Sequence, residues 1–98
     1  MGPGAVLNDN PLLAFLGKRG RGAVVEALRR NPGRPLHVRE LARLADVAPM
    51  VASRAARELQ ALNAVEVARR GSLVAIRLDE GTPAGAFLAT VTVPDPPF

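Results

Sequence analysis

The segment Val38–Leu62, VRELARLADVAPMVASRAARELQAL, decides the fold. Its first part has apolar residues at the i, i+3, i+4, i+7 spacing of one buried helix face, namely Val38, Leu41, Ala42 and Ala45. Asp46-Val47-Ala48 interrupts this pattern, and Pro49 follows, which suits the first turn of a new helix because its missing N–H costs nothing there. A second apolar face then consists of Ala52, Ala55, Ala56, Leu59 and Leu62. The segment therefore predicts two helices joined by a tight turn.

This arrangement is that of a helix-turn-helix, whose second helix lays its N-terminal half in the major groove of DNA. The small alanines of the second helix would let the two helices approach closely. Two interpretations are open on this segment alone, a DNA-binding unit and an ordinary helical hairpin, because helix–turn–helix patterns are common. The residues outside the second apolar face are Met50, Val51, Ser53, Arg54, Arg57 and Glu58.

A β-hairpin is predicted directly after the second helix. Asn63 follows the last periodic residue, at the place where a left-handed residue commonly ends a helix. The runs 65–69 and 73–78 alternate with period 2 around Arg70-Gly71-Ser72, which is typical of a hairpin. The short segment 34–37 is predicted to be a small first strand that pairs with this hairpin.

The stretch 18–78 resembles the winged helix-turn-helix domains of bacterial and archaeal transcriptional regulators, of the broad ArsR/MarR-like kind. The resemblance rests on the run RELARLADVAPMVASRAARELQALNAVEVARRGSLVAIRL, which has a "RELA" helix, a turn, a helix ending in "L..L", an Asn, a valine and a hairpin. It implies a mainly α fold with a small β-hairpin wing (α+β), built on three core helices with a further terminal helix. Helix 49–62 would enter the major groove, and the basic hairpin tip 69–72 would form the wing.

The resemblance also implies which residues contact DNA. The groove-facing positions are Pro49, Met50, Val51, Ser53, Arg54 and Arg57, and the wing residues are Arg69, Arg70 and Ser72. Lys18, Arg19 and Arg21, at the start of an earlier helix, would hold phosphates; plain solvated charge is the alternative. The family usually has Ser or Thr where this chain has Ala48, and Met50 and Val51 replace a small polar pair. Val51 is therefore suited to touch a thymine methyl group rather than to hydrogen-bond a base.

Charge is distributed unevenly along the chain. All 13 Lys and Arg residues lie between Lys18 and Arg77 with five of the 9 acidic residues, so this segment carries +8 and the two ends carry −4. Such a segment is the electrostatic footprint of a polyanion binder, although a merely soluble basic surface is the alternative. Phe15, Phe87 and Phe98 lie outside it, so a stacking platform for single-stranded nucleic acid is missing.

No enzyme, metal or cofactor site is predicted. The 98 residues contain no cysteine, which excludes disulfides and thiolate metal sites, and His37 is the one histidine. Gly17–Gly22 lacks the spacing of a phosphate loop or a dinucleotide fingerprint, and Ser53 and Ser72 lack a nucleophile-elbow setting. No apolar run approaches the length of a membrane span, and no signal peptide opens the chain, so we expect a cytoplasmic, nucleoid-associated protein.

Three regions are predicted: a flexible N-terminus over 1–10, a DNA-binding domain over 11–80, and a C-terminal extension over 81–98. A short helix is expected from Pro11, capped by one of residues 8–10. Another is expected over 23–30, with a buried stripe of Val24, Ala27 and Leu28 and with Val25 near its edge. Glu40 and Arg43 have the spacing of an i, i+3 surface ion pair.

The extension has two interpretations. Thr82-Pro83 predicts the start of a short helix over 84–90, with one face formed by Ala84, Phe87, Leu88 and Val91. The run 87–93 is also β-prone, which would make it a strand, but we favour the helix. Residues 94–98 read as a loose end.

Two functions follow from these patterns. The first is sequence-specific binding of double-stranded DNA by a small transcriptional regulator, a repressor or an architectural factor. Such regulators usually dimerise through terminal helices, so the apolar residues of 11–16 (Leu12, Leu13, Phe15 and Leu16) and of 81–98 are expected to contribute to a homodimer. The second is a winged helix that serves as a protein-interaction module.

Overall fold

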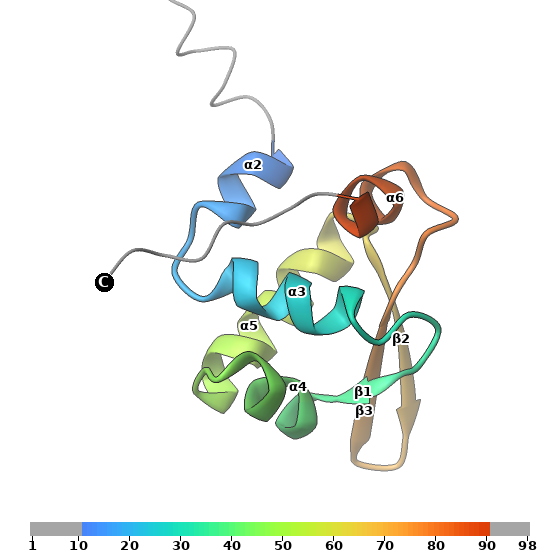
Figure 1. Cartoon of the computed structure of the whole chain (residues 1–98). Coiled ribbons are helices and arrows are strands. Elements are labelled where there is room, and N and C mark those ends of the chain that lie inside the picture. Colours follow the sequence, from blue (N-terminus) through green and yellow to red (C-terminus); the bar gives the residue numbers. More distant parts are fainter. Residues whose placement is uncertain (1–10, 91–98) are drawn as a thin grey trace, which may run out of the picture.

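The computed structural model describes residues 11–90, which form five helices and a three-stranded antiparallel sheet (Figure 1). The helices are α2 (Pro11–Leu16), α3 (Arg21–Arg29), α4 (Val38–Ala45), α5 (Pro49–Ala61) and α6 (Pro83–Thr90). The strands are β1 (Leu36–His37), β2 (Val65–Arg70) and β3 (Leu73–Leu78). None of the helices within residues 11–90 is long and apolar enough to cross a membrane.

Helices α4 and α5 form the predicted pair. Their buried residues are Leu41, Ala42 and Ala45 on α4 and Ala52, Ala55, Ala56 and Leu59 on α5, as the periodicity indicated. Asp46 ends α4 in the left-handed conformation (φ 55°), which Asp tolerates better than most residues. Ala48 is the N-cap of α5 and makes no side-chain cap, since it has no hydroxyl. The left-handed conformation predicted for Asn63 is confirmed (φ 59°).

The sheet has the order β1-β3-β2, which places β3 between the predicted first strand and the rest of the hairpin. Ile76 pairs with Leu36 on one side and with Val67 on the other. The predicted three-residue turn 70–72 is one residue too long, because Arg70 is still paired with Leu73. The turn consists of two residues, of which Gly71 has a φ of 60° that glycine adopts without strain.

Helix α3 is the centre of the core. It contacts each of the other four helices and β3. For this reason the expectation that Val25 lies near the edge of a stripe is wrong: Val24, Val25 and Leu28 are all fully buried. A helix enclosed on several sides buries more than the single stripe of a surface helix.

Helix α2 is also confirmed, and it covers one side of α3 (Figure 1). Phe15 is buried in the domain's own core, and Leu12 and Leu16 pack against that core. These three side chains therefore serve the fold of this chain. The predicted flexible N-terminus and the capping residues 8–10 lie outside the described residues.

The tail forms a helix rather than a strand over its described part. The Thr82 Oγ1 atom accepts a hydrogen bond of 3.0 Å from the Gly85 N–H, which caps the first turn of α6. The predicted face is confirmed in part: Leu88 is buried and Ala84 packs against the core, but Phe87 is 38% exposed and Gly85 is buried instead. The reason is Gly85, which lies so close to the backbone of Asp79 that a Cβ there would be 1.7 Å from the carbonyl oxygen. Val91 and the loose end 94–98 lie outside the described residues.

Candidate nucleic-acid interface

The exposed side of α5 carries the residues that the sequence assigned to the major groove. Met50, Arg54 and Arg57 are exposed one helical turn apart, and Ser53 beside them is half-buried. Pro49 is exposed at the start of the helix. No acidic residue lies in the first turn, where a carboxylate would repel a phosphate.

Val51 does not share this exposed side. It is half-buried, and a Cβ built on Gly20 would lie only 3.0 Å from its Cγ1 atom. Gly20 has a φ of 79° and directly precedes α3. Val51 therefore packs α5 against the loop between α2 and α3, a contact that helical periodicity alone does not reveal.

The hairpin carries its basic residues at its far end. Arg69 and Arg70 are the last two residues of β2, and they and Ser72 are exposed. Successive side chains of a strand point to opposite faces, so Arg69 and Arg70 project from the two sides of the ribbon. In Figure 1 this end of the hairpin points away from α2 and α6, and α4 lies beside it.

Lys18 and Arg21, two of the predicted phosphate contacts, form ion pairs within the molecule. Lys18 Nζ lies 2.6 Å and Arg21 Nε lies 2.7 Å from the two carboxylate oxygens of Glu58 on α5. The hydrogen bond from Lys18, followed by that from Arg21, holds the pKa of the Glu58 carboxyl below its ordinary value of 4.5. Arg19, between them, is exposed and makes no ion pair among residues 11–90.

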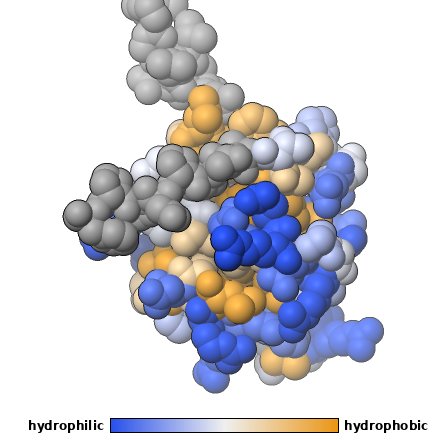
Figure 2. Space-filling model, viewed as in Figure 1, coloured by the Kyte–Doolittle hydropathy of each residue, from blue (hydrophilic) through white to orange (hydrophobic). Residues whose placement is uncertain are grey.

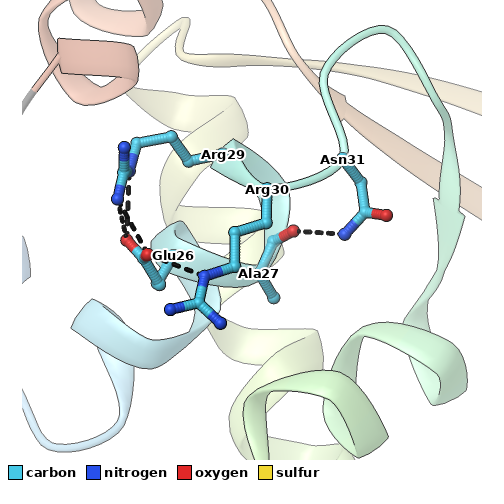
Figure 3. Close-up of polar contacts among 5 residues, drawn as sticks. All are labelled: Glu26, Ala27, Arg29, Arg30 and Asn31. Atoms are coloured by element: carbon cyan, nitrogen blue, oxygen red, sulfur yellow. Dashed lines mark hydrogen bonds and ion pairs between the residues drawn. The ribbon is translucent and has the colours of Figure 1, made fainter.

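The end of α3 carries a similar group of ion pairs, in which two arginines share one carboxylate (Figure 3). Both Arg29 and Arg30 reach back to Glu26, at 2.6 Å and 2.9 Å. The hydrogen bond from Arg29 is the main cause of a lowered pKa of Glu26. The Asn31 Nδ2 atom donates a hydrogen bond of 2.8 Å to the carbonyl oxygen of Ala27 and satisfies one group at the helix end.

Two further ion pairs complete this set. Arg34 lies 2.7 Å from Glu40, so the predicted pair of Glu40 with Arg43 is wrong. The loop before β1 brings the long Arg34 side chain to the first turn of α4, and it takes the place of Arg43. The other pair joins Arg77 to Glu66 across the hairpin.

The ion pairs divide the cations into two groups. Six of the 13 Lys and Arg residues are paired with carboxylates, and seven are not. The seven, which we call the free arginines, make no ion pair or side-chain hydrogen bond within residues 11–90. They lie on the loop before α3, on α4, on α5 and on the hairpin: Arg19, Arg39, Arg43, Arg54, Arg57, Arg69 and Arg70.

Arg39 and Arg43 are members of this group that the sequence reasoning did not select. Both are exposed on α4, four residues apart and opposite its buried face. Their i, i+4 spacing was the available signal. In Figure 2, hydrophilic side chains cover much of the lower part and the right-hand side of the molecule, and apolar ones are visible at the top and in smaller patches lower down.

The arrangement of α3, α4, α5 and the three-stranded sheet is that of a winged helix-turn-helix domain, as predicted. Among solved structures, the chain is similar to the AntR antimony-specific transcriptional repressor, with a TM-score of 0.65 and 23% identity over 88% of this chain and 71% of that one. At this identity the similarity establishes the fold. Searches of protein families and of curated proteins give no match.

Proposed function

We propose that this protein binds double-stranded DNA and regulates transcription, with α5 in the major groove and the hairpin as its wing. The observation that carries the proposal is the placement of the free arginines. Four carboxylates pair with six cations elsewhere in the domain and leave unpaired those on the helix-turn-helix, at the wing tip and at Arg19. A polyanion would meet its positive charge there.

Each part of this surface has a role in the proposal. Arg54 and Arg57, with Ser53, would reach base edges in the major groove, where arginine favours guanine. Arg39 and Arg43 on α4 would hold phosphates, since the first helix of such a unit crosses the DNA backbone.

The loop and the wing complete the proposed contact. Arg69, Arg70 and Ser72 would contact the minor groove or its phosphates. Arg19 would meet a phosphate, while Lys18 and Arg21 would position its loop through Glu58.

A more specific version of the proposal is that the protein is a dimeric repressor. The similar AntR is a transcriptional repressor, and α2 and α6 lie at the end of the molecule opposite the hairpin tip (Figure 1). A second copy docked at that end would leave both helix-turn-helix units accessible to a two-fold operator. The antimony specificity of AntR is not part of the proposal, because the 98 residues of this chain contain no cysteine to supply thiolate ligands.

A protein-interaction module is the second candidate. It is favoured by three large apolar residues that are exposed on the helix-turn-helix and the hairpin, Met50 at 64%, Leu73 at 56% and Leu44 at 50%. The seven free arginines favour DNA more strongly, since unpaired charge of a single sign attracts a polyanion.

The test is selection of binding sites from a genomic library of duplex DNA, followed by affinity measurements against salt. We expect an enriched palindrome and a steep slope of log affinity against log salt, about −0.9 for each phosphate contact. Arg54→Ala should weaken binding to that site by about 1–3 kcal/mol and relax its specificity at one base pair. Arg30→Ala is the matched control, because Arg30 is exposed but paired with Glu26, and it should change binding little.

Each outcome of this experiment is informative. Salt-sensitive binding without an enriched sequence would replace the regulator with an architectural binder. The absence of binding at moderate salt would overturn DNA binding altogether and favour the protein-interaction module.

A further inference from the structure

The first turn of α5 presents an apolar side chain to solvent where DNA readers commonly present polar ones. Met50 has the largest exposed fraction, 64%, among the large hydrophobic residues of the described chain. It stands on the same side of α5 as Arg54 and Arg57, so it lies within the surface proposed to enter the major groove.

The neighbours of Met50 leave this turn without hydrogen-bonding side chains. Ala48 and Pro49 carry none, and Pro49 also lacks a backbone N–H. Val51 is turned toward Gly20, and Ala52 is fully buried. The side chain that this turn offers to a base edge is therefore the thioether of Met50, which can make apolar contacts but donates no hydrogen bond.

The major groove contains one kind of apolar group on its base edges, the C5-methyl group of thymine. We propose that Met50 is a specificity-determining residue that recognises this methyl group, an inference that rests on the proposed binding of duplex DNA. It replaces the sequence-based expectation that Val51 makes this contact. The flexible Met side chain can follow a methyl group over several positions, which a β-branched valine cannot.

Arg54 fixes where the thymine should lie in the site. It follows Met50 by four residues, which is about 6 Å along the helix axis and so roughly two base-pair steps. Arg54 is exposed and free, and arginine prefers the O6 and N7 atoms of guanine. The predicted half-site therefore contains a thymine within about two steps of a guanine.

The test removes the methyl group alone. In the selected duplex, each thymine is replaced in turn by deoxyuridine, which keeps every hydrogen-bonding group of the base. With the wild-type protein we expect one position per half-site to lose about fourfold in affinity, the value of one buried methyl-sized group. Met50→Ala should lose about the same factor on the thymine duplex and show no further loss with uracil.

Leu73→Ala is the matched control, since Leu73 is also apolar and exposed but lies on the hairpin. This variant should keep the full penalty for uracil. Circular dichroism would verify that both variants fold, as expected for substitutions at exposed positions.

The possible failures are distinguishable. If no uracil position matters, or if Met50→Ala keeps the same uracil penalty, Met50 does not recognise the methyl group and this inference is overturned while DNA binding stands. If the wild-type protein binds no duplex at all, the proposed function fails, and this inference fails with it.

Discussion

Glu58 shows how one carboxylate can order a part of the proposed binding surface. It lies on α5, but its side chain is 30% exposed and faces the loop before α3 rather than the exposed arginines. Arg21, one of its two partners, is 11% exposed, so this ion pair is shielded from water more than a surface pair. Together with the contact of Gly20 and Val51, it holds the loop that carries Arg19.

We expect Glu58→Gln to lower the free energy of unfolding by about 1 kcal/mol at neutral pH. The pKa of Glu58 is lowered in the folded protein, so its stabilisation is complete above the ordinary value of 4.5 and is lost as the pH falls through the lower, folded value. Urea denaturation of both proteins at pH 7 and near pH 3 measures this effect. The difference between wild type and variant should shrink at the acidic pH.

Glu66→Gln is the matched control for this prediction. Glu66 also pairs with an arginine, but it is 55% exposed, and its loss should cost less than the loss of Glu58. Equal costs for the two variants would contradict the special role of Glu58.

For single residues, the sequence predicted the properties that depend on spacing along one helix. The exposure of Met50, Arg54 and Arg57 follows from helical periodicity and is confirmed. The partners of Glu58 lie 40 and 37 residues away in the chain, so their pairing depends on how α3 packs on α5. The free arginines could not be separated from the paired ones without such contacts.

Helix α6 shows that the sequence predicts where a helix starts more easily than how that helix packs. Its existence was predicted from Thr82-Pro83, because capping is local chemistry. Its buried face was predicted only in part: Leu88 is buried, but hydrophobicity also favoured Phe87, which is exposed. The close contact of Gly85 with the Asp79 carbonyl, which sets the rotation, joins the helix to the end of β3.

Gly85→Ala should therefore displace α6. The added Cβ would meet backbone atoms of Asp79, which cannot move aside as a flexible side chain can. We expect a loss of about 1–3 kcal/mol in the free energy of unfolding, measured by chemical denaturation. In Gly17→Ala the new Cβ would have only ordinary contacts of 3.5 Å and 3.6 Å, so that variant should have a much smaller effect. Equal stability of the two variants would mean that α6 tolerates a shift.

At the scale of the whole molecule, most of the free arginines lie away from the two terminal helices. Six of the seven free arginines lie on the helix-turn-helix and the hairpin, and Arg19 lies on the loop before α3, while α2 and α6 occupy the end opposite the hairpin tip (Figure 1). The sequence predicted the +8 of the central segment and the fold that carries it. It could not predict which carboxylates would neutralise which cations, because that depends on the assembled structure.

Phe87 tests the proposed homodimer. It is 38% exposed on α6, at the end of the molecule away from the hairpin tip. We expect Phe87→Glu to convert a dimer to a monomer in sedimentation velocity experiments, because a charge buried at an apolar interface is costly. Leu73→Glu places the same charge at another exposed apolar residue, on the hairpin, and this variant should remain dimeric. A wild-type protein that is monomeric at micromolar concentration would contradict the homodimer.

The hydroxyl group of Thr82 connects the end of α5 to the start of α6 through hydrogen bonds. It donates a hydrogen bond of 2.5 Å to the carbonyl oxygen of Asn63, just beyond α5, while it accepts one from the first turn of α6. If two copies associate through α6, these hydrogen bonds would restrict the movement of α5 relative to α6 and so limit the range of separations between the two α5 helices. Such a dimer would bind two half-sites about one helical turn of DNA apart. It would bind the same half-sites more weakly when a few base pairs are inserted between them.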